Sequence, residues 1–246
     1  MVNQKPTNYY TLYNGDAIEQ MKLLSDNSVD FICVDLPYGT TQNKWDTIIP
    51  FEPLWEQFNR VGKETAAMVF TATQPFTAKI VMSNLDNFKY DLIWEKTISS
   101  GQLNVSHMPM RNHESILVFY RKKPTYNEQK TIGKPYTINR KGEYKEGNYG
   151  EQKATKKENT GYRHAKSVIK ISNPRIKNGH PTQKPVELME YLIKMFTNEG
   201  DTVLDCCMGA GTTGEAALNL KRKFIGIELD TSYFISSQER LEKCSE

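Results

Sequence analysis

The sequence predicts an α/β fold built on a doubly wound, mainly parallel sheet. Short apolar runs alternate along the chain with segments whose apolar residues recur at helical spacing, the pattern of successive strand–helix units. The run Val29–Val34 is apolar except at Asp30, as in a strand buried on both faces of a parallel sheet. The length of 246 residues suits one such domain with an insertion.

The first strand–helix units are expected near the amino terminus. Tyr9–Tyr13 is an aromatic-rich strand candidate, and the polar turn after it ends with Asp16, which can cap the helix Ala17–Leu24. Pro75 suits the first turn of a later helix, where the missing N–H has no partner to lose. The same reasoning predicts strands Val29–Val34 and Thr65–Thr71 and helices Phe51–Val61 and Gln74–Leu85.

The rest of the chain is expected to complete the sheet. Further strands are predicted at Tyr90–Lys96 and Glu114–Tyr120, and a helix at Val186–Phe196. A strand starting at Asp201 runs into a glycine loop and a helix, Glu215–Leu220. The last predicted strand is Lys223–Ile227.

Composition excludes several classes of protein. No apolar run approaches the 18 residues that suggest a membrane span, and the first ten residues contain no apolar signal core. The four cysteines form no Cys-x-x-Cys pair, and we interpret them as reduced residues rather than zinc ligands or disulfides. We therefore expect a cytoplasmic protein without a metal site.

The segment 121–178 differs from the rest of the chain. From Arg121 to Lys177 it holds 16 Lys/Arg against 5 Glu, a net charge of +11, whereas the whole chain carries only +3. Tyrosines interleave with these basic residues, so the segment has side chains suited to phosphates and to bases. A solvated insertion is the alternative. The sequence thus divides into 1–120, a basic insertion at 121–178, and 179–246.

The corner Asp35-Leu36-Pro37-Tyr38 follows the most apolar strand. Chemistry in open α/β sheets lies beyond the carboxyl ends of strands, so Asp35 and Tyr38 are placed where a substrate would lie. The Asp35 carboxylate and a proline-stiffened carbonyl at Pro37 are two acceptors for one planar NH2 group. The Tyr38 ring offers a stacking face for a base. An ordinary turn with a surface tyrosine is the alternative.

Two further segments suit a nucleoside-like cofactor. The loop Gly209-Ala210-Gly211 permits close backbone approach to a ligand, and Glu228 ends the next strand, where an acidic side chain suits ribose hydroxyls. A Gly-x-Gly loop also occurs in proteins that bind NAD or FAD. Here Thr212 and Thr213 take the place of the third glycine that holds a pyrophosphate, which favours a cofactor without phosphate.

These motifs together resemble those of the amino-group DNA methyltransferases. Asp35-Leu36-Pro37-Tyr38 is similar to the Asp-Pro-Pro-Tyr signature, and residues 180–185, His-Pro-Thr-Gln-Lys-Pro, nearly match the cofactor-contacting motif. The glycine loop is similar to Asp-Pro-Phe-x-Gly-Ser-Gly-Thr-Thr, although Cys206-Cys207 replaces Pro-Phe and Ala210 replaces Ser. The resemblance spans residues 9–244, in the motif order of the circularly permuted β class.

The resemblance implies a Rossmann-like methyltransferase fold with one antiparallel strand and S-adenosylmethionine as cofactor. Residues 1–120 would form the catalytic half, 121–178 the target-recognition insertion, and 179–246 the cofactor half. The implied catalytic residues are Asp35, Pro37 and Tyr38. The implied cofactor-binding residues are Asp16, Asp35, Thr182, Lys184, Pro185, Asp205, Cys207, Gly209, Gly211, Thr212, Thr213 and Glu228. The expected DNA-binding residues are Lys44, Trp45, Arg140, Lys141, Arg163 and Lys166.

Because the signature begins with Asp rather than Ser, we expect methylation of the N6 amine of adenine in double-stranded DNA. N4 methylation of cytosine stays open, as do methylation of a protein glutamine and a DNA-binding module without activity. Cytosine C5 methylation is rejected, because no Pro-Cys pair supplies its thiolate nucleophile. A homodimer and a cognate restriction enzyme also stay open as partners.

Overall fold

The computed structural model describes residues 9–40, 46–140, 154–173 and 183–245. The chain forms two compact units. Unit 1 comprises Met1–Asn127 and Ser167–Glu246, and unit 2 comprises Glu128–Lys166. Residues 121–127 and 167–173 of the basic segment therefore cluster with unit 1.

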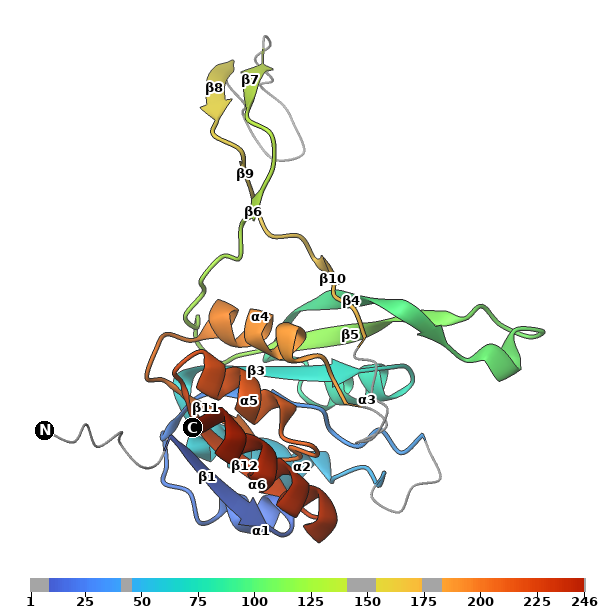
Figure 1. Cartoon of the computed structure of the whole chain (residues 1–246), viewed down its shortest axis with the longest axis vertical. Coiled ribbons are helices and arrows are strands. Elements are labelled where there is room, and N and C mark those ends of the chain that lie inside the picture. The colour runs from blue at the N-terminus through green and yellow to red at the C-terminus, as the bar shows by residue number, and fades with distance from the viewer. Residues whose placement is uncertain (1–8, 41–45, 141–153, 174–182, 246) are drawn as a thin grey trace, which may run out of the picture. The chain divides into compact units, whose positions relative to one another are not determined.

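Unit 1 contains a central sheet whose eight described strands lie in the order β1-β12-β11-β2-β3-β5-β4-β10 (Figure 1). Neighbours run parallel except at β5, which pairs antiparallel with β3 and with β4. The predicted parallel sheet with one antiparallel strand is confirmed. The strands are β1 (Tyr10–Asn14), β2 (Val29–Val34), β3 (Gly62–Ala72), β4 (Phe88–Ser100), β5 (Arg111–Phe119), β10 (Val168–Lys170), β11 (Thr202–Asp205) and β12 (Lys223–Glu228).

Helices cover both faces of this sheet. In Figure 1, α4, α5 and α6 lie in front of the sheet. They contribute to one buried apolar cluster, and α1, α2 and α3 contribute to a second cluster. The helices are α1 (Ala17–Met21), α2 (Phe51–Val61), α3 (Phe76–Ser83), α4 (Val186–Phe196), α5 (Thr212–Asn219) and α6 (Thr231–Ser245), with a short 3-10 helix η1 (Gln102–Asn104).

Strand β2 separates the two apolar clusters. Phe31 packs into the cluster with α4, whereas Ile32 packs into the cluster with α2, because successive side chains of a strand point to opposite faces. Five of the six β2 side chains are buried, and Asp30 is the exception. The apolar run in the sequence is thus explained by burial on both faces, and it fixes the position at which the strand ends.

Several predicted boundaries differ from the structure. Helix α1 ends at Met21 rather than Leu24, and α5 begins at Thr212 rather than Glu215, because Gly211 makes the turn before it with φ of 75°. Strands β4 and β5 extend past their apolar cores as a hairpin. The pattern did not indicate α6 or β10, which pairs with β4.

Unit 2 consists of two short antiparallel ribbons in its described residues. Strand β6 (Thr131–Ile132) pairs with β9 (Tyr162–Arg163), and β7 (Tyr136–Arg140) pairs with β8 (Thr155–Asn159). The Arg163 guanidinium lies over the Tyr136 ring, 4.5 Å from its centroid, and donates to Asn159 Oδ1 at 2.7 Å. Arg163 therefore holds the two ribbons of this unit together.

Within the described part of the chain, no helix combines the length and apolarity needed to cross a membrane. All four cysteines are free thiols.

Candidate active site

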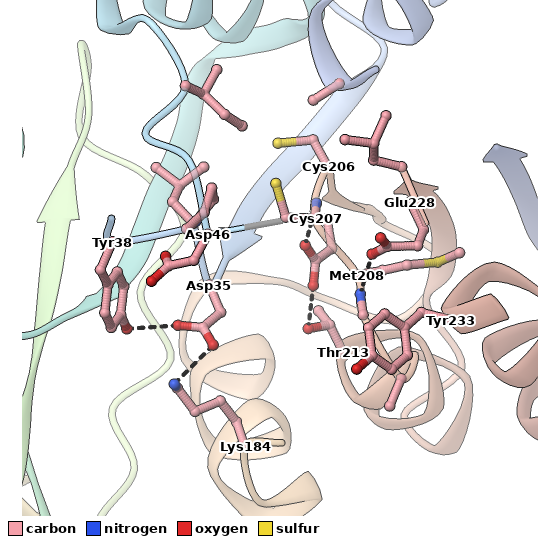
Figure 2. A pocket seen from close by; sticks show the side chains of 18 of the residues that line it. Asp35, Tyr38, Asp46, Lys184, Cys206, Cys207, Met208, Thr213, Glu228 and Tyr233 are labelled. Carbon is pink, nitrogen blue, oxygen red and sulfur yellow. Dashed lines mark hydrogen bonds and ion pairs between the residues drawn. The ribbon is translucent and has the colours of Figure 1, made fainter. Parts of the chain in front are cut away.

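The carboxyl ends of β1, β12, β11 and β2 meet at one edge of the sheet, which is where ligands bind in open α/β sheets. A cavity of about 950 Å³ opens at this edge within unit 1 (Figure 2). Ligand pockets in proteins usually reach about 1,000 Å³ at most, so this one has room for a nucleoside-sized cofactor and a second flat group.

Asp35 lies in this cavity immediately after β2, with its carboxylate held by three side chains. Oδ1 accepts hydrogen bonds from the Tyr38 hydroxyl at 2.6 Å and from the Thr71 hydroxyl at the end of β3. Oδ2 is 2.8 Å from the Lys184 ammonium. These contacts fix the plane of the carboxylate before any ligand arrives.

Lys184 is a buried cation between two carboxylates. Its Nζ atom is 2.8 Å from Asp35 Oδ2 and 3.1 Å from Oε2 of Glu114, which lies on β5. Burial by itself would lower the pKa of Lys184, but the Asp35 carboxylate, Tyr38 and Glu114 raise it well above its usual value. Lys96 on β4 completes the group, with its ammonium 2.5 Å from Glu114 Oε1. The two negative carboxylates, Asp35 and Glu114, are thus balanced by two positive ammonium groups.

The Tyr38 ring and its loop are fixed by packing and by one carboxylate. The ring stacks on Phe76 with 5.1 Å between centroids, and burial raises the pKa of the hydroxyl, which stays a neutral donor. Asp46 is buried and accepts from the backbone N–H groups of Gly39 at 2.8 Å and Thr40 at 2.9 Å. Asp46 thereby holds the backbone of the two residues that follow Tyr38.

The glycine loop after β11 is organised by Asp205. Its carboxylate accepts from the Cys207 N–H at 3.1 Å and from the Thr213 hydroxyl at 2.6 Å, so the loop folds back toward the first turn of α5. Burial raises the pKa of Asp205 to about 7, against the effect of these two hydrogen bonds. A fully buried carboxyl thus titrates near neutral pH beside the loop.

The raised pKa of Asp205 predicts a pH-dependent stability. Because the folded protein binds this proton up to about pH 7 while the ordinary pKa is 3.8, the contribution of Asp205 to the free energy of unfolding should be fully present below pH 4 and lost as the pH rises to 7. The loss is at most about 4 kcal/mol. Urea unfolding of the wild type and Asp205→Asn from pH 4 to pH 8 should show this loss in the wild type alone. Parallel pH profiles would refute the assignment.

Glu228 ends β12 and faces the same cavity. Its carboxylate accepts from the Gly209 N–H at 2.8 Å and from the Asp230 N–H at 2.9 Å, and Met208 and Tyr233 line the same cavity (Figure 2). Burial raises the pKa of Glu228, and the two backbone hydrogen bonds oppose that rise. Each oxygen keeps a second lone pair that can accept from a ligand hydroxyl.

Arg240 on α6 contacts both the glycine loop and the residues just before α4. Its guanidinium donates to the Ala210 carbonyl at 3.0 Å and to the Thr212 hydroxyl at 3.3 Å, and it pairs with Glu215. With its amide oxygen turned toward Arg240, Gln183 accepts from the same guanidinium at 2.8 and 2.9 Å. This helix therefore joins the glycine loop to the segment preceding α4.

Most of the residues selected from the sequence meet in this one cavity. Its lining includes Asp16, Asp35, Pro37, Tyr38, Lys184, Asp205, Cys207, Gly209, Thr212, Thr213 and Glu228. Asp16 also caps α1 as predicted, accepting from the Glu19 N–H at 3.1 Å. Pro185 and Gly211 stand beside the cavity as the residues that precede α4 and α5.

The residues proposed to contact DNA are only partly described. Thr182 of the cofactor motif and Lys44, Trp45 and Lys141 lie outside the described residues. Arg140, Arg163 and Lys166 lie in unit 2, where Arg140 ends β7 and its side chain is not described. The structure also adds residues that the motifs did not indicate. These are Thr71, Asp46, Lys96, Glu114 and Arg240.

The cavity fits S-adenosylmethionine, a cofactor without a phosphate group. Gly209 and Gly211 have φ of 50° and 75°, a conformation that favours glycine and leaves the loop backbone accessible to a ligand. A Cβ atom on Gly211 would meet the Ser237 Cβ at 3.0 Å. Carboxylates line the cavity at the ends of three strands, where they suit the hydroxyl and amine groups of a ligand better than they suit a phosphate. The fold and this site define a methyltransferase dependent on S-adenosylmethionine.

Comparison with known proteins gives the family. Residues 29–239 match the sequence model of the N6/N4 DNA methylases, described as DNA methylase. The chain belongs to this family and is a DNA amino-methyltransferase. It is 30% identical to the DNA adenine methyltransferase YhdJ of Escherichia coli K12, over 96% of this chain and 83% of that protein. It is also 30% identical to the type II methyltransferase M.HpaI of Haemophilus parainfluenzae, over 93% of this chain and 73% of that protein.

Solved structures agree with the fold. The M1.HpyAVI complex with S-adenosylmethionine superposes with a TM-score of 0.64 at 27% identity, covering 94% of this chain and 100% of that one. The PvuII cytosine-N4-specific DNA methyltransferase superposes with a TM-score of 0.69 at 16% identity, covering 97% of this chain and 93% of that one. The second similarity concerns the fold alone.

Proposed function

We propose that this enzyme methylates the N6 amine of adenine in double-stranded DNA. The observation that carries the proposal is the position of Asp35, whose carboxylate shares one cavity with the glycine loop and with Glu228. An Asp at the start of the signature favours adenine, and YhdJ, the similar E. coli protein, is an adenine methyltransferase. The N4 amine of cytosine presents the same NH2 group and is the alternative.

The residues that line the cavity include hydrogen-bonding groups suited to the ribose, the adenine and the amino-acid portion of S-adenosylmethionine. When bound, this cofactor supplies an electrophilic methyl group on a sulfonium sulfur. Glu228 would accept from the ribose hydroxyls, Asp16 from the adenine amine, and the backbone from Gly209 to Thr212 would hold the amino-acid portion. Cys207 would take the place of an apolar side chain against the cofactor.

The chain's own residues prepare the target nitrogen. Asp35 and the carbonyl of Pro37 would accept hydrogen bonds from the two N–H groups of the amine, which draws the nitrogen lone pair out of conjugation with the ring. The negative carboxylate stabilises the positive charge that develops on this nitrogen, a preorganised electrostatic effect. Tyr38, fixed on Phe76, would stack on the base and hold it for in-line attack. The base must leave the helix stack first, at a cost of a few kcal/mol.

Unit 2 supplies positive charge for DNA. Its described residues include seven Lys/Arg and two Glu, and Lys156 and Lys157 of β8 are both exposed. Phosphate contacts of this kind position a protein on the duplex without selecting a sequence. We propose that unit 2 is the principal part of the target-recognition region.

Neutralising these two lysines should weaken DNA binding. Lys156→Gln/Lys157→Gln should raise the Kd for duplex DNA about tenfold near 0.1 M salt and reduce the slope of log K against log salt by about 2. Fluorescence anisotropy at several salt concentrations measures both. Lys122→Gln is the matched control, because that lysine is paired with Glu64 in unit 1. An unchanged salt slope in the double variant would exclude these lysines as phosphate contacts.

A labelled-methyl assay tests the substrate class. The wild-type protein should transfer tritiated methyl from S-adenosylmethionine to unmethylated duplex DNA and should leave structured RNA and bulk protein unlabelled. Calorimetry of the cofactor alone should show one site per chain. Label in RNA or protein but not in DNA would overturn the proposal.

A further inference from the structure

The Lys184 ammonium occupies the place in which the target amine is expected. Its Nζ atom is 2.8 Å from Asp35 Oδ2 and lies over the Tyr38 ring, 5.7 Å from the centroid. Figure 2 shows the three side chains pointing toward one another. Asp35 and Tyr38 are the groups proposed to hold the amine and the base. An ammonium is an N–H donor, as the amine is, so Lys184 mimics the substrate in this subsite.

A target amine must therefore compete for Asp35. Oδ1 already accepts from the Tyr38 and Thr71 hydroxyls, and Oδ2 is paired with Lys184. A charge-assisted contact of this kind is stronger than a hydrogen bond from a neutral amine. The base gains Oδ2 only if the ammonium has another acceptor within reach.

Glu114 provides that acceptor. Its Oε2 atom is buried and lies 3.1 Å from Lys184 Nζ, a longer contact than the 2.8 Å between the same ammonium and Asp35 Oδ2. A buried carboxylate oxygen needs a donor, and this oxygen can accept a closer contact from the Lys184 ammonium than the one it has. Oε1 is held by Lys96 at 2.5 Å, so the carboxylate is anchored on one side and presents Oε2 to Lys184 on the other.

The charges allow the ammonium to shift between the two acceptors. Asp35 and Glu114 are balanced by Lys184 and Lys96, so a movement of Lys184 toward Glu114 changes no net charge in the cluster. Lys184 and Glu114 are each 8% exposed, so neither can turn to bulk water as an alternative partner. Glu114 is the second carboxylate with which the Lys184 ammonium is already paired, so it is the destination at hand when Asp35 is taken by a ligand.

We propose that the Lys184 ammonium occupies the amine subsite of the substrate-free enzyme by pairing with Asp35. When the target base enters, the ammonium moves from Asp35 to pair with Glu114. Glu114 is then a positioning residue for methyl transfer, anchored by Lys96, and it does not contact the cofactor. This inference rests on the proposed function, because the entering group is the amine of a flipped base.

Single-turnover methyl transfer with saturating cofactor separates this role from a structural one. Glu114→Gln should slow transfer about tenfold or more, because the ammonium keeps its hold on Asp35. The Kd for S-adenosylmethionine should stay within about threefold in Glu114→Gln and in Lys184→Met. Glu114→Gln/Lys184→Met should be faster than Glu114→Gln by about threefold or more, since the competing donor is gone. Glu95→Gln, which removes an exposed pair with Lys170, is the matched control.

A second measurement does not depend on DNA methylation. In protein labelled with 15N-lysine, the Lys184 Nζ resonance, assigned by its loss in Lys184→Met, should shift both in Asp35→Asn and in Glu114→Gln. Adding duplex DNA and S-adenosylhomocysteine to the wild type should move this resonance toward its position in Asp35→Asn, where Glu114 is the remaining carboxylate partner. Glu114→Asp serves if Glu114→Gln fails to bind cofactor, and it should retain more activity than a neutral residue would.

Three results would overturn the inference. One is a double variant no faster than Glu114→Gln, another is a Lys184 resonance indifferent to Glu114→Gln, and the third is a rise in cofactor Kd above about tenfold in Lys184→Met. The last result would make Lys184 a cofactor ligand. A wild type that methylates no DNA would refute the proposed function. The Lys184 Nζ resonance measured without DNA would still decide whether Asp35 and Glu114 share the ammonium.

Discussion

Replacing Asp35 by asparagine should reduce methyl transfer to DNA by about a thousandfold, the effect of removing one preorganised charged group from a transition state. Asparagine keeps the size of the side chain but loses the negative charge that opposes the positive charge developing on the amine. It also replaces one acceptor oxygen by a donor NH2 that faces the Lys184 ammonium. Single-turnover transfer to unmethylated duplex DNA measures the effect.

Two controls define this result. Asp26→Asn removes a carboxylate that pairs with Arg60 at 2.6 Å and is 68% exposed on its side chain, and it should leave transfer unchanged. The Kd of Asp35→Asn for S-adenosylmethionine should change by less than about tenfold, because most proposed cofactor contacts come from other residues. Asp35→Asn with wild-type transfer would show that this carboxylate does not act on the amine.

Replacing Glu228 by glutamine should raise the Kd for S-adenosylmethionine about a hundredfold. The proposed ribose contacts are two hydrogen bonds to a charged group, and their weakening is worth about 3 kcal/mol. Glutamine also brings an NH2 group against the Gly209 N–H, which the Glu228 carboxylate accepts at 2.8 Å. Isothermal titration calorimetry measures the affinity without DNA.

The matched control for Glu228 is Glu239→Gln on α6, where the carboxylate is exposed. It should bind cofactor as the wild type does. At saturating cofactor, Glu228→Gln should transfer methyl groups at a rate close to that of the wild type, because the residue is proposed to hold the ribose and not the amine. Unchanged cofactor affinity in Glu228→Gln would remove this residue from the cofactor site.

The fold was predictable from the sequence where one signal dominated. The bounds of β2, α2 and α4 agree with the expected ranges, because burial on both faces or amphipathic spacing defines them. Helix α6 was missed because polar residues fill most of its length. The short β10 was missed because only its pairing with β4 makes it a strand.

The site was predictable only as far as each residue belonged to a local motif. Asp35 directly follows β2 and Glu228 ends β12, and both positions could be inferred from the apolar runs before them. Thr71, Lys96 and Glu114 come from neighbouring strands and meet Lys184 only through tertiary pairing. One signal was available for Thr71, since it lies near the end of a strand parallel to β2 and thus at the same edge.

Nucleoside analysis of methylated DNA tests the central claim most directly. Unmethylated duplex DNA containing all sequence contexts would be incubated with the wild-type enzyme and methyl-labelled S-adenosylmethionine, digested to nucleosides and separated by mass. The account predicts label in N6-methyldeoxyadenosine, and no label with Asp35→Asn. Label in N4-methyldeoxycytidine alone would contradict the choice of base, and DNA without label would contradict the assignment of this carboxylate to a nucleobase amine.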